Sequence, residues 1–467
     1  MGTSRRALLI SGGVVAAGAV GLAGRRVWLD REPVALPALD KGGHLLWQNW
    51  SGIEHAYPAT RAAPASADEA AHLLKTASGP VRTVGAGHSF TGLVPTDATL
   101  VSLDRMTGVL GHDPATHQAS VAAGTRLYEL GPALAAIGQA MPNLPDINKQ
   151  SLAGGTQTGT HGTGRGLQAV HGGIIAFDLA TPRGEVMECS ATSNPEVFNA
   201  ARVGLGAFGI VTRFTLQNQP LTRVKKVVSM RRRDDLIDGW DDMVGRHRNV
   251  EFYVIPFSNY GQLITHDETT EPVRPRGPDT DADGAMELKH ARDLFEFASP
   301  LRFWMADHLI AEVPDQVSID EGWKLLSNER PVRFCEMEYH LPRENQIAAL
   351  REVIAAIETH RSDVFFPIEV RAIAPDDAWL SSFYGRDSGS IAVHAYYKDD
   401  YQFFYTLIEP ILRRHGGRPH WGKLNSLVYN DFAALYPRWK EALAVRDHLD
   451  PEGKLLNPYL HKVLRRD

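Results

Sequence analysis

The feature that most constrains the fold of this chain is a pair of glycine-rich segments in its first third. They are VGAGHS at residues 84–89 and a longer stretch at residues 151–166, which holds six glycines. A residue without a Cβ lets backbone N–H groups approach an anion closely. Neither segment has the Gly-Lys-Ser/Thr of a P-loop, so ATP or GTP chemistry is not expected. Both suit a dinucleotide whose pyrophosphate is held by backbone amides, with two unrelated surface loops as the alternative.

A third glycine motif, GLGAFG at residues 204–209, matches the G-x-G-x-x-G pattern of Rossmann dinucleotide sites. In a Rossmann unit these glycines open a helix after a strand. Here they are followed by IVTRFTLQ, which is β-branched and alternating and therefore predicts a strand. We interpret the motif as a tight bend before the last strand of the first domain.

Size and charge exclude several classes of function. At 467 residues the chain is long enough for two domains. The formal net charge is −6 and no basic patch dominates, so nucleic acid is not an expected partner. Cys189 and Cys335 lie far apart and share no metal-ligand spacing, so we expect neither a metal site nor a disulfide framework.

The first residues, 1–30, are different in kind from the rest. The pattern SRRALL at residues 4–9 precedes a weakly hydrophobic run, rich in Gly and Ala, at residues 7–24. This layout predicts a twin-arginine export signal, and with it a location in the periplasm or on the outer face of the inner membrane. The alternative is an N-terminal membrane anchor, because the run is at the short end for a span. Whether the signal is cleaved stays open.

The rest of the chain divides into three parts. Residues 57–221 alternate short strands with helices, including a capped helix that starts near Ser66 and a hairpin at residues 172–190. Residues 222–410 hold further strands and a long helix, which is the makeup of a second α+β domain. Within it, residues 265–295 are polar and proline-rich and predict an exposed loop. Residues 411–467 form a mainly helical C-terminal segment.

Four stretches in the last third carry a more specific signal: PIEVR at 367–371, WLS at 379–381, RPHWGK at 418–423 and LDP…LNPYL at 449–460. Together with the glycine motifs, and in this order, they resemble the FAD-linked sugar-lactone oxidases of the vanillyl-alcohol oxidase superfamily. That group includes gulonolactone and arabinonolactone oxidases and the alditol oxidases. The resemblance covers nearly all of the chain after residue 45.

The resemblance implies an α+β fold with a two-subdomain FAD-binding domain of the vanillyl-alcohol oxidase type. A substrate (cap) domain follows, and the C-terminal tail returns to the FAD domain. In family members with a histidine in the first glycine motif, that histidine is bonded to the flavin 8α-methyl group, so FAD is expected to be covalent through His88. A non-covalent contact is the alternative. The residues expected to bind the cofactor are Val84, Gly85, Ala86, Gly87, His88, Ser89, Gly155, Thr158, Gly159, Thr160, His161, Gly162, Gly209, Ile210 and Asn457.

The expected catalytic residues lie in the second half of the chain. Glu369 and Arg371 are two residues apart in an apolar strand, so both side chains point to one face and predict a lined cavity. A structural salt bridge is the alternative. By resemblance, both bind substrate hydroxyls. His394 is the candidate proton acceptor, or else a core histidine. Lys423 is the candidate cation beside the flavin, or else a surface lysine.

These observations lead to one expected function. The chain is expected to be an FAD-dependent oxidoreductase that oxidises a CH–OH group of a sugar-acid 1,4-lactone, with O2 as acceptor and H2O2 as product. An alditol (polyol) oxidase is the first alternative. A lactone dehydrogenase that uses a quinone or cytochrome, a non-catalytic flavin-binding protein, and a flavin enzyme acting on a phenol or an amine are the others.

Overall fold

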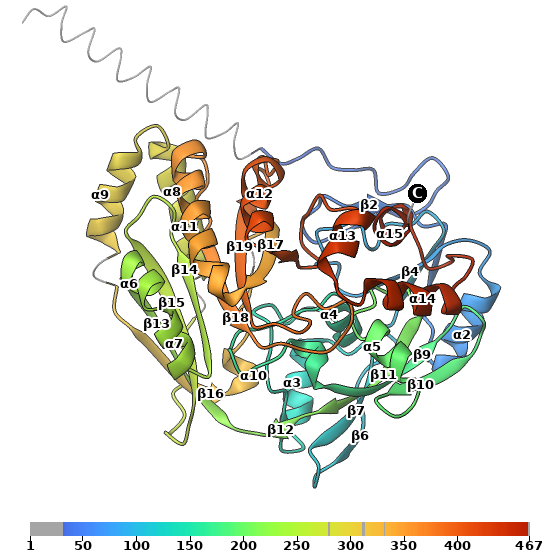
Figure 1. The fold of residues 1–467 in the computed structure, drawn as a ribbon. Helices are drawn as coiled ribbons and strands as arrows, with labels where there is room; N and C mark the ends of the chain where they lie inside the picture. Colours follow the sequence, from blue (N-terminus) through green and yellow to red (C-terminus); the bar gives the residue numbers. More distant parts are fainter. Residues whose placement is uncertain (1–30, 279–280, 311–312, 331, 466–467) are drawn as a thin grey trace, which may run out of the picture.

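The computed structural model describes residues 31–278, 281–310, 313–330 and 332–465. Figure 1 shows two lobes side by side. The right-hand lobe contains two small sheets from the first half of the chain, and the left-hand lobe is built around one eight-stranded sheet. This mixed α+β arrangement confirms the predicted fold class.

The first subdomain is a three-stranded parallel sheet in the order β3-β5-β4. Its elements are β3 (Thr60–Ala62), α2 (Ala67–Thr76), β4 (Val81–Val84) and β5 (Thr99–Ser102). Helix α2 is capped as predicted, because the Ser66 side chain accepts the N–H of Glu69. Strand β4 ends directly at the first glycine-rich segment, so the sheet fixes where that turn stands.

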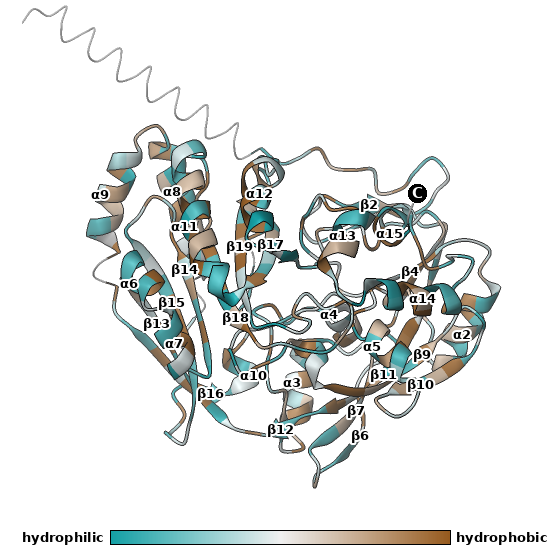
Figure 2. Ribbon diagram, viewed as in Figure 1, coloured by the Kyte–Doolittle hydropathy of each residue, from teal (hydrophilic) through white to brown (hydrophobic). Residues whose placement is uncertain are grey.

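The second subdomain is a five-stranded antiparallel sheet in the order β10-β9-β11-β7-β6. Its strands are β6 (Val109–Asp113), β7 (Gln118–Ala122), β9 (Ile174–Ala180), β10 (Val186–Ser190) and β11 (Ile210–Gln217). Strands β9 and β10 form the predicted hairpin. In Figure 2 the strands at the centre of this lobe are mostly brown, because alternate residues such as Phe177 and Phe214 fill the core. The smaller elements around both sheets are β1 (Trp47–Gln48), β2 (His55–Ala56), α3 (Leu127–Ala135), β8 (Gln139–Ala140), α4 (Leu152–Gln157), η1 (Val170–Gly173), α5 (Pro195–Ala201) and β12 (Gln219–Pro220).

The motif at residues 204–209 is a bend, as predicted, and the Rossmann interpretation is excluded. The chain has positive φ angles of 58° at Leu205, 63° at Gly206 and 157° at Gly209. It then enters strand β11 and no helix. A Cβ on Gly209 would lie 2.5 Å from the carbonyl oxygen of Ala180, so the glycine allows the bend to pack against β9.

The cap lobe is an eight-stranded sheet in the order β16-β13-β15-β14-β18-β19-β17-β20, all neighbours running antiparallel. Its strands are β13 (Arg223–Arg232), β14 (Asn249–Val254), β15 (Tyr260–Thr269), β16 (Gln316–Glu321), β17 (Phe334–Pro342), β18 (Ile368–Ile373), β19 (Ser388–Tyr396) and β20 (Arg418–Pro419). Helix α11 (Arg343–His360) packs on β17 and β19. The other cap helices are α6 (Arg233–Asp238), α7 (Trp240–Arg246) and α10 (Gly322–Leu325).

The prediction of an exposed loop at residues 265–295 is wrong. Strand β15 continues to Thr269, and the segment ends in helix α8 (Asp281–Phe295), which is followed by α9 (Ser299–Leu309). The two helices form a hairpin at one end of the cap, at the upper left of Figure 1.

Helix α8 could not be recognised from the sequence because several of its buried side chains are charged. Lys289 Nζ lies 2.7 Å from the carboxylate of Asp293, and Arg292 donates both to Asp293 and to Asp399 at 2.9 Å. All but Asp399 are nearly inaccessible to solvent. A buried face made of ion pairs gives no hydrophobic periodicity, which is the signal used to recognise helices.

The C-terminal segment returns to the FAD-binding lobe, as the fold class predicted. Its helices are α13 (Tyr429–Leu435), α14 (Trp439–Leu449) and α15 (Pro458–Leu464). The two elements before them, η2 (Phe404–Ile408) and α12 (Glu409–Arg414), pack on α11 of the cap. The fully buried Arg82 guanidinium on β4 donates to the carbonyls of Leu93, Leu205, Gly206 and Leu455. One side chain therefore ties the first sheet to the bend at 204–209 and to the tail, and burial lowers its pKa to about 9.

The predictions on residues 1–30 lie outside the described residues. Among the residues described, no helix has both the length and the apolar character needed to cross a membrane.

Candidate active site

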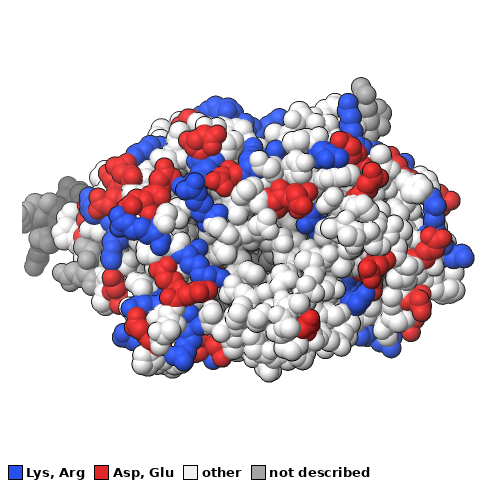
Figure 3. All heavy atoms as spheres, turned by 60° about the horizontal axis from the view of Figure 1, so that its bottom comes forward, with Lys and Arg blue, Asp and Glu red and all other residues white. Residues whose placement is uncertain are grey.

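A large cavity lies between the two lobes. Its volume is about 590 Å³, and its walls come from all three glycine motifs and from one face of the cap sheet. Figure 3 shows the molecule from below, where the face is hollowed near its centre and the rim of that hollow is mostly uncharged. The charged side chains of the site line the inside of the cavity, and they come from both lobes.

The first glycine-rich turn offers unpaired backbone N–H groups to this cavity. The carbonyls of Gly87 and Ser89 accept hydrogen bonds from the neighbouring segment, from Trp50 N–H and from the Asn49 side chain. The N–H groups of Ala86, Gly87, His88 and Ser89, by contrast, donate to no protein acceptor within the described residues. Backbone donors in folded proteins are nearly always paired. The turn is therefore built to donate to a ligand.

The second glycine-rich segment begins as a helix, where the sequence suggested a loop. Ser151 caps α4 by accepting the N–H of Gly154, and the segment leaves the helix at Thr158. The same Ser151 side chain packs on the first turn, since a Cβ on Gly85 would lie 2.5 Å from its Oγ. The two glycine segments thus touch each other across one wall of the cavity.

Most of the predicted site residues line the cavity. They are Val84, Gly85, Ala86, Gly87, His88, Ser89, Thr158, Thr160, His161, Gly209, Ile210, Glu369, Arg371, His394 and Lys423. Gly155, Gly159, Gly162 and Asn457 do not. Gly162 serves packing, since a Cβ there would lie 2.2 Å from the carbonyl oxygen of Leu144. Asn457 caps α15 and donates to the carbonyls of Gly92 and Pro95, so it holds a neighbouring loop in place.

His88 stands at the end of the first turn with its ring against Trp50. The ring centroids are 5.0 Å apart. Burial and the nearby positive charge of Lys423 lower the pKa of His88 to about 4. The imidazole is therefore neutral at physiological pH and keeps a nucleophilic lone pair.

One face of the cap sheet is polar where β14, β18, β19 and β17 lie side by side. Three of these strands each contribute a pair of polar residues two positions apart, namely Glu251 and Tyr253, Glu369 and Arg371, and Glu336 and Glu338. The register places Arg371 beside Glu251 and Glu369 beside Tyr253. Because side chains alternate along a strand, these pairs share one face.

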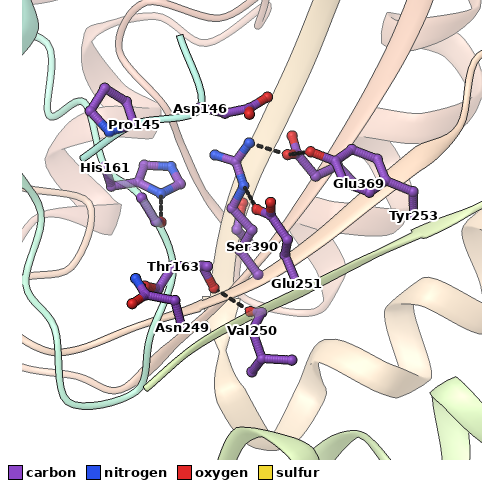
Figure 4. A network of polar contacts seen from close by, with 12 residues as sticks. Pro145, Asp146, His161, Thr163, Asn249, Val250, Glu251, Tyr253, Glu369 and Ser390 are labelled. Carbon is purple, nitrogen blue, oxygen red and sulfur yellow. Dashed lines mark hydrogen bonds and ion pairs between the residues drawn. The ribbon is translucent and has the colours of Figure 1, made fainter. Parts of the chain in front are cut away.

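Arg371 is held between the carboxylates of Glu251 and Glu369, which Figure 4 shows together with Tyr253. Its Nε donates to Glu251 at 3.0 Å, and its Nη2 donates to Glu369, which also accepts the hydroxyl of Tyr253. Burial raises the pKa of Glu251 to about 7 even though Arg371 opposes the shift. The two carboxylates hold the pKa of Arg371 well above its usual value, against the effect of burial. Glu369 and Arg371 share one face and line the cavity, and they also form the ion pair that was the alternative. The structure adds Glu251 and Tyr253 as their partners.

His394 and Lys423 meet at Glu336. Lys423 donates to one oxygen of this carboxylate, and His394 Nε2 lies 3.8 Å from the other. His394 Nδ1 lies 3.0 Å from the carbonyl oxygen of Pro367, which can only accept, so Nδ1 carries the hydrogen. When the ring is neutral, its lone pair is on Nε2, on the side of Glu336.

A second polar group surrounds Glu338. His161 Nε2 lies 3.0 Å from its carboxylate, and Ser390 donates to it. Burial would raise the pKa of Glu338, but the nearby histidines hold it well below its usual value. His420 Nδ1 accepts the N–H of Gly422, so the neutral ring carries its hydrogen on Nε2. In this tautomer Nε2 is a donor and Nδ1 already accepts from Gly422, so neither nitrogen has a free lone pair for a metal ion.

Several cavity residues were missed from the sequence: Asp146, Tyr253, Glu336, Glu338 and His420. A usable signal existed for three of them. The strands NVEFYV and FCEMEYHLP carry polar residues at alternate positions among buried apolar ones, as does the strand of Glu369. Asp146 and His420 lie in irregular segments, where no periodicity marks them.

The cavity fits FAD on the structure's own evidence. A row of unpaired N–H groups suits a pyrophosphate. Glycine at position 85 keeps the turn in contact with Ser151, and a neutral histidine stands at the end of the turn. The carboxylates, arginine and histidine of the cap face the same space and suit a small polyhydroxyl molecule.

Comparisons with known proteins agree with this geometry. A family model described as D-arabinono-1,4-lactone oxidase matches residues 214–463, and one described as FAD binding domain matches residues 58–190. L-gulono-1,4-lactone dehydrogenase of Mycobacterium tuberculosis is 34% identical over 90% of this chain and 99% of its own length. L-gulonolactone oxidase of Bos taurus is 31% identical over 89% of this chain and 98% of its own length.

Among solved structures, cholesterol oxidase from B. sterolicum has a TM-score of 0.72, covering 93% of this chain and all of that one. At 16% identity this likeness concerns the fold alone. The family model covers more than half of the 467 residues, and the similarity to lactone dehydrogenases and oxidases extends over almost the whole described chain. The chain belongs to the D-arabinono-1,4-lactone oxidase family of FAD-binding oxidoreductases.

Proposed function

We propose that this protein is an FAD-dependent enzyme that oxidises a CH–OH group of an aldono-1,4-lactone of the arabinono-, gulono- or galactono- type. The observation that carries the proposal is the buried Glu369–Arg371 pair, which faces the same cavity as the unpaired amides of residues 86–89 and is held from behind by Glu251. Relatives named as lactone oxidases and as a lactone dehydrogenase support the substrate class.

FAD would be held by the first glycine turn, by the end of α4 and by the bend before β11. Bound FAD supplies the acceptor for the hydride that leaves the substrate carbon. We further propose that His88 is bonded covalently to the flavin. Its depressed pKa and its place at the end of the turn support this, because a neutral imidazole can act as a nucleophile.

The cap residues would position the substrate and take its proton. Arg371 can donate to a substrate oxygen, and Glu369 can accept from a hydroxyl, which fixes the carbon that reacts. In the neutral ring with its hydrogen on Nδ1, His394 Nε2 has a lone pair and can accept the hydroxyl proton as the hydride leaves. Lys423 and Glu336 form an ion pair beside His394, so these two neighbours together carry no net charge.

Two further proposals concern the acceptor and the location. We propose O2 as an acceptor, in line with relatives named as oxidases, although another relative is named a dehydrogenase. We propose export through the twin-arginine pattern at residues 4–9, with periplasmic location or attachment to the outer face of the inner membrane.

A substrate panel tests the function. Purified holoenzyme is incubated with arabinono-, gulono- and galactono-1,4-lactone and with matching alditols, once with O2 and once without O2 but with a soluble dye. We expect turnover on at least one lactone and faster turnover on lactones than on alditols. Turnover on alditols alone would identify the alditol alternative, and turnover on neither with any acceptor would contradict an enzymatic role.

Acid precipitation tests the covalent bond. In wild-type protein the flavin fluorescence should stay with the precipitated chain, because an acid-stable bond connects the two. In His88→Ala it should be released into the supernatant, while the variant still binds FAD through the unpaired amides. Release of the colour from both proteins would show that His88 makes only a non-covalent contact.

A further inference from the structure

The cavity continues beyond the charged group into an apolar chamber. Its floor is one row of residues across four neighbouring strands: the register places Glu369 beside Tyr253, Tyr253 beside Gln262, and Gln262 beside Met230. All four line the cavity. Neighbouring strands are about 4.8 Å apart, so the row extends roughly 14 Å from the charged end to Met230. The row begins at the carboxylate of Glu369 and ends at the thioether of Met230.

The α8–α9 hairpin forms the roof of this chamber. Ala285, Leu288 and Ala291 of α8 line it at intervals of three residues, which places them on one face of the helix. Met305 and Ala306 of α9 line it too. Arg302 also reaches the wall, but its guanidinium donates to the carbonyls of Ser362 and Val364. Glu287 of α8 lines the cavity as well, so apart from this carboxylate the roof offers mainly hydrocarbon to whatever lies beneath it.

A sugar lactone does not explain such a chamber. Its hydroxyl groups would lose hydrogen bonds to water against alanine, leucine and methionine side chains, which is unfavourable. A hydrocarbon chain gains from the same surface. The continuity of the chamber with the charged group means that a ligand with a polar head and an apolar tail can place its head in the active site and its tail under α8–α9.

The outer surface of the same hairpin is apolar as well. Of the thirteen large hydrophobic side chains found exposed among the described residues, five lie between residues 294 and 313. Phe297 is 75% exposed and Trp304 57%. Such a concentration on one surface element marks a contact with another apolar phase. Val313 belongs to this group and also lines the cavity, so the chamber reaches the surface beside the C-terminal end of α9.

The start of the described chain lies near this hairpin. Glu32 forms an ion pair with Lys398 at 2.8 Å, and the next residue, Asp399, binds Arg292 of α8. In Figure 1 the first described residues and the connection between α8 and α9 are both at the top of the molecule. The hydrophobic run at residues 7–24 precedes this point in the sequence. A lipid bilayer is an apolar phase that an exposed surface of this kind can contact.

We propose that the chamber under α8–α9 binds the hydrocarbon tail of a membrane quinone, which is a second electron acceptor besides O2. This inference rests on the proposed function, because the electrons come from the lactone. The substrate CH–OH group loses two electrons and two protons and becomes C=O. The quinone takes up two electrons and two protons and becomes the quinol, so that lactone and quinone balance with no further reactant.

The test compares acceptors that differ only in the tail. Holoenzyme without O2 receives a lactone and one of three acceptors: a water-soluble dye, a ubiquinone headgroup without a tail, or the same headgroup with a decyl tail. We expect the tail to lower the KM for the quinone by about tenfold or more, because buried methylene groups each add favourable free energy. The dye is not expected to depend on the chamber.

Two matched variants locate the effect. Ala291→Phe fills the chamber from α8, and His290→Phe makes the same change at the neighbouring, exposed position outside the cavity. The advantage of the tail should disappear in Ala291→Phe and remain in His290→Phe, with dye reduction unchanged in both. Ala306→Phe on α9 repeats the test should Ala291→Phe fold poorly. Quenching of tryptophan fluorescence by the decyl quinone, measured without lactone, reports binding independently of turnover.

The outcomes separate the two claims. Dye reduction with no advantage of the tail, and equal quenching in Ala291→Phe and His290→Phe, overturns the quinone site while the proposed function stands. Binding of the decyl quinone to the chamber without its reduction also overturns it, and indicates an apolar group on the substrate. If the lactone reduces no acceptor, the proposed function and the quinone's role as its acceptor both fail.

Discussion

The two walls of the cavity bind in different ways. The FAD-side wall uses backbone: a turn of small residues with unpaired N–H groups, shaped by glycines where a Cβ would collide with Ser151 or Ala180. The cap wall uses side chains: carboxylates, an arginine and a histidine, nearly all buried and paired to one another across strands. Backbone amides suit a cofactor that remains bound through many turnovers. Side chains can orient a substrate that enters and leaves in each turnover, and they can also accept its proton.

The difference predicts how each wall fails. On the cap wall, loss of one side chain leaves its partners charged, buried and unpaired, so the damage is chemical and large. On the FAD side, an added methyl group changes the shape of the turn and leaves its N–H groups in place, so the damage is steric and smaller. The predictions below are ordered by this expectation.

The largest effect is expected for Arg371→Met. This change leaves Glu251 and Glu369 buried side by side without their cation and removes the donor to the substrate. We expect kcat/KM on the lactone to fall by roughly a thousandfold. Arg213→Met removes a half-exposed ion pair with Asp178 and is the control, with a change of less than about twofold.

Flavin content per chain is measured in parallel with Arg371→Met. We expect the flavin content to stay near the wild-type value, because Arg371 belongs to the cap wall. Wild-type turnover in Arg371→Met would contradict the role given to that wall.

A smaller effect is expected for Gly85→Ala on the FAD side. The new methyl group would lie 2.5 Å from Ser151 Oγ, which also caps α4, so both glycine segments would shift. We expect FAD to bind roughly ten- to a hundredfold more weakly, as an extra methyl costs about 1–3 kcal/mol in a packed site. The dissociation constant is measured in a His88→Ala background, where FAD can leave.

Gly111→Ala is the matched control for this change. A Cβ at Gly111, on strand β6, would have nothing within 4 Å. FAD affinity should be unchanged there. Equal weakening by both substitutions would mean that the shape of the first turn does not determine binding.

The smallest effect is expected for His340→Phe, behind the cap wall. Both ring nitrogens of His340 are buried without a hydrogen-bond partner, and burial together with His161 holds its pKa well below the usual value. The unfolded chain takes up a proton at this histidine near pH 6.5 and the folded chain does not, so wild-type stability falls as the pH drops below that value.

His340→Phe removes this pH dependence. We expect its advantage over wild type to grow by about 2 kcal/mol between pH 8 and pH 5, which is a rise in relative Tm of a few degrees. His112→Phe, at an exposed position on β6, is the control. An advantage that is the same at both pH values would show that folding does not lower the pKa of His340.

The two walls also differ in how far the sequence predicts them. The turn at residues 84–89 is local, so strand, glycines and histidine could be placed from a few adjacent letters. The Glu369–Arg371 pair was found because alternation puts both on one face. Glu251, Glu336 and Glu338 carried the same signal on other strands, but only the pairing of β14, β18, β19 and β17 shows that these faces coincide.

The features that the sequence did not predict were missed for physical reasons. Helix α8 was taken for a loop because Lys289, Arg292 and Asp293 form its buried side, where the usual pattern requires apolar residues. Asn457 was placed at the cofactor, although its amide is used up by the carbonyls of Gly92 and Pro95. Both cases concern polar side chains whose partners are distant in sequence, and a pattern within one segment carries no information about such partners.

The most direct test of the central claim is the absorbance of the bound flavin when lactone is added to the wild-type holoenzyme in the absence of O2. The account predicts that an aldono-1,4-lactone bleaches the flavin absorbance within the mixing time or shortly after, in a ratio of one lactone to one flavin, and that Arg371→Met bleaches far more slowly. A flavin absorbance that stays unchanged with every lactone of the panel would contradict the account.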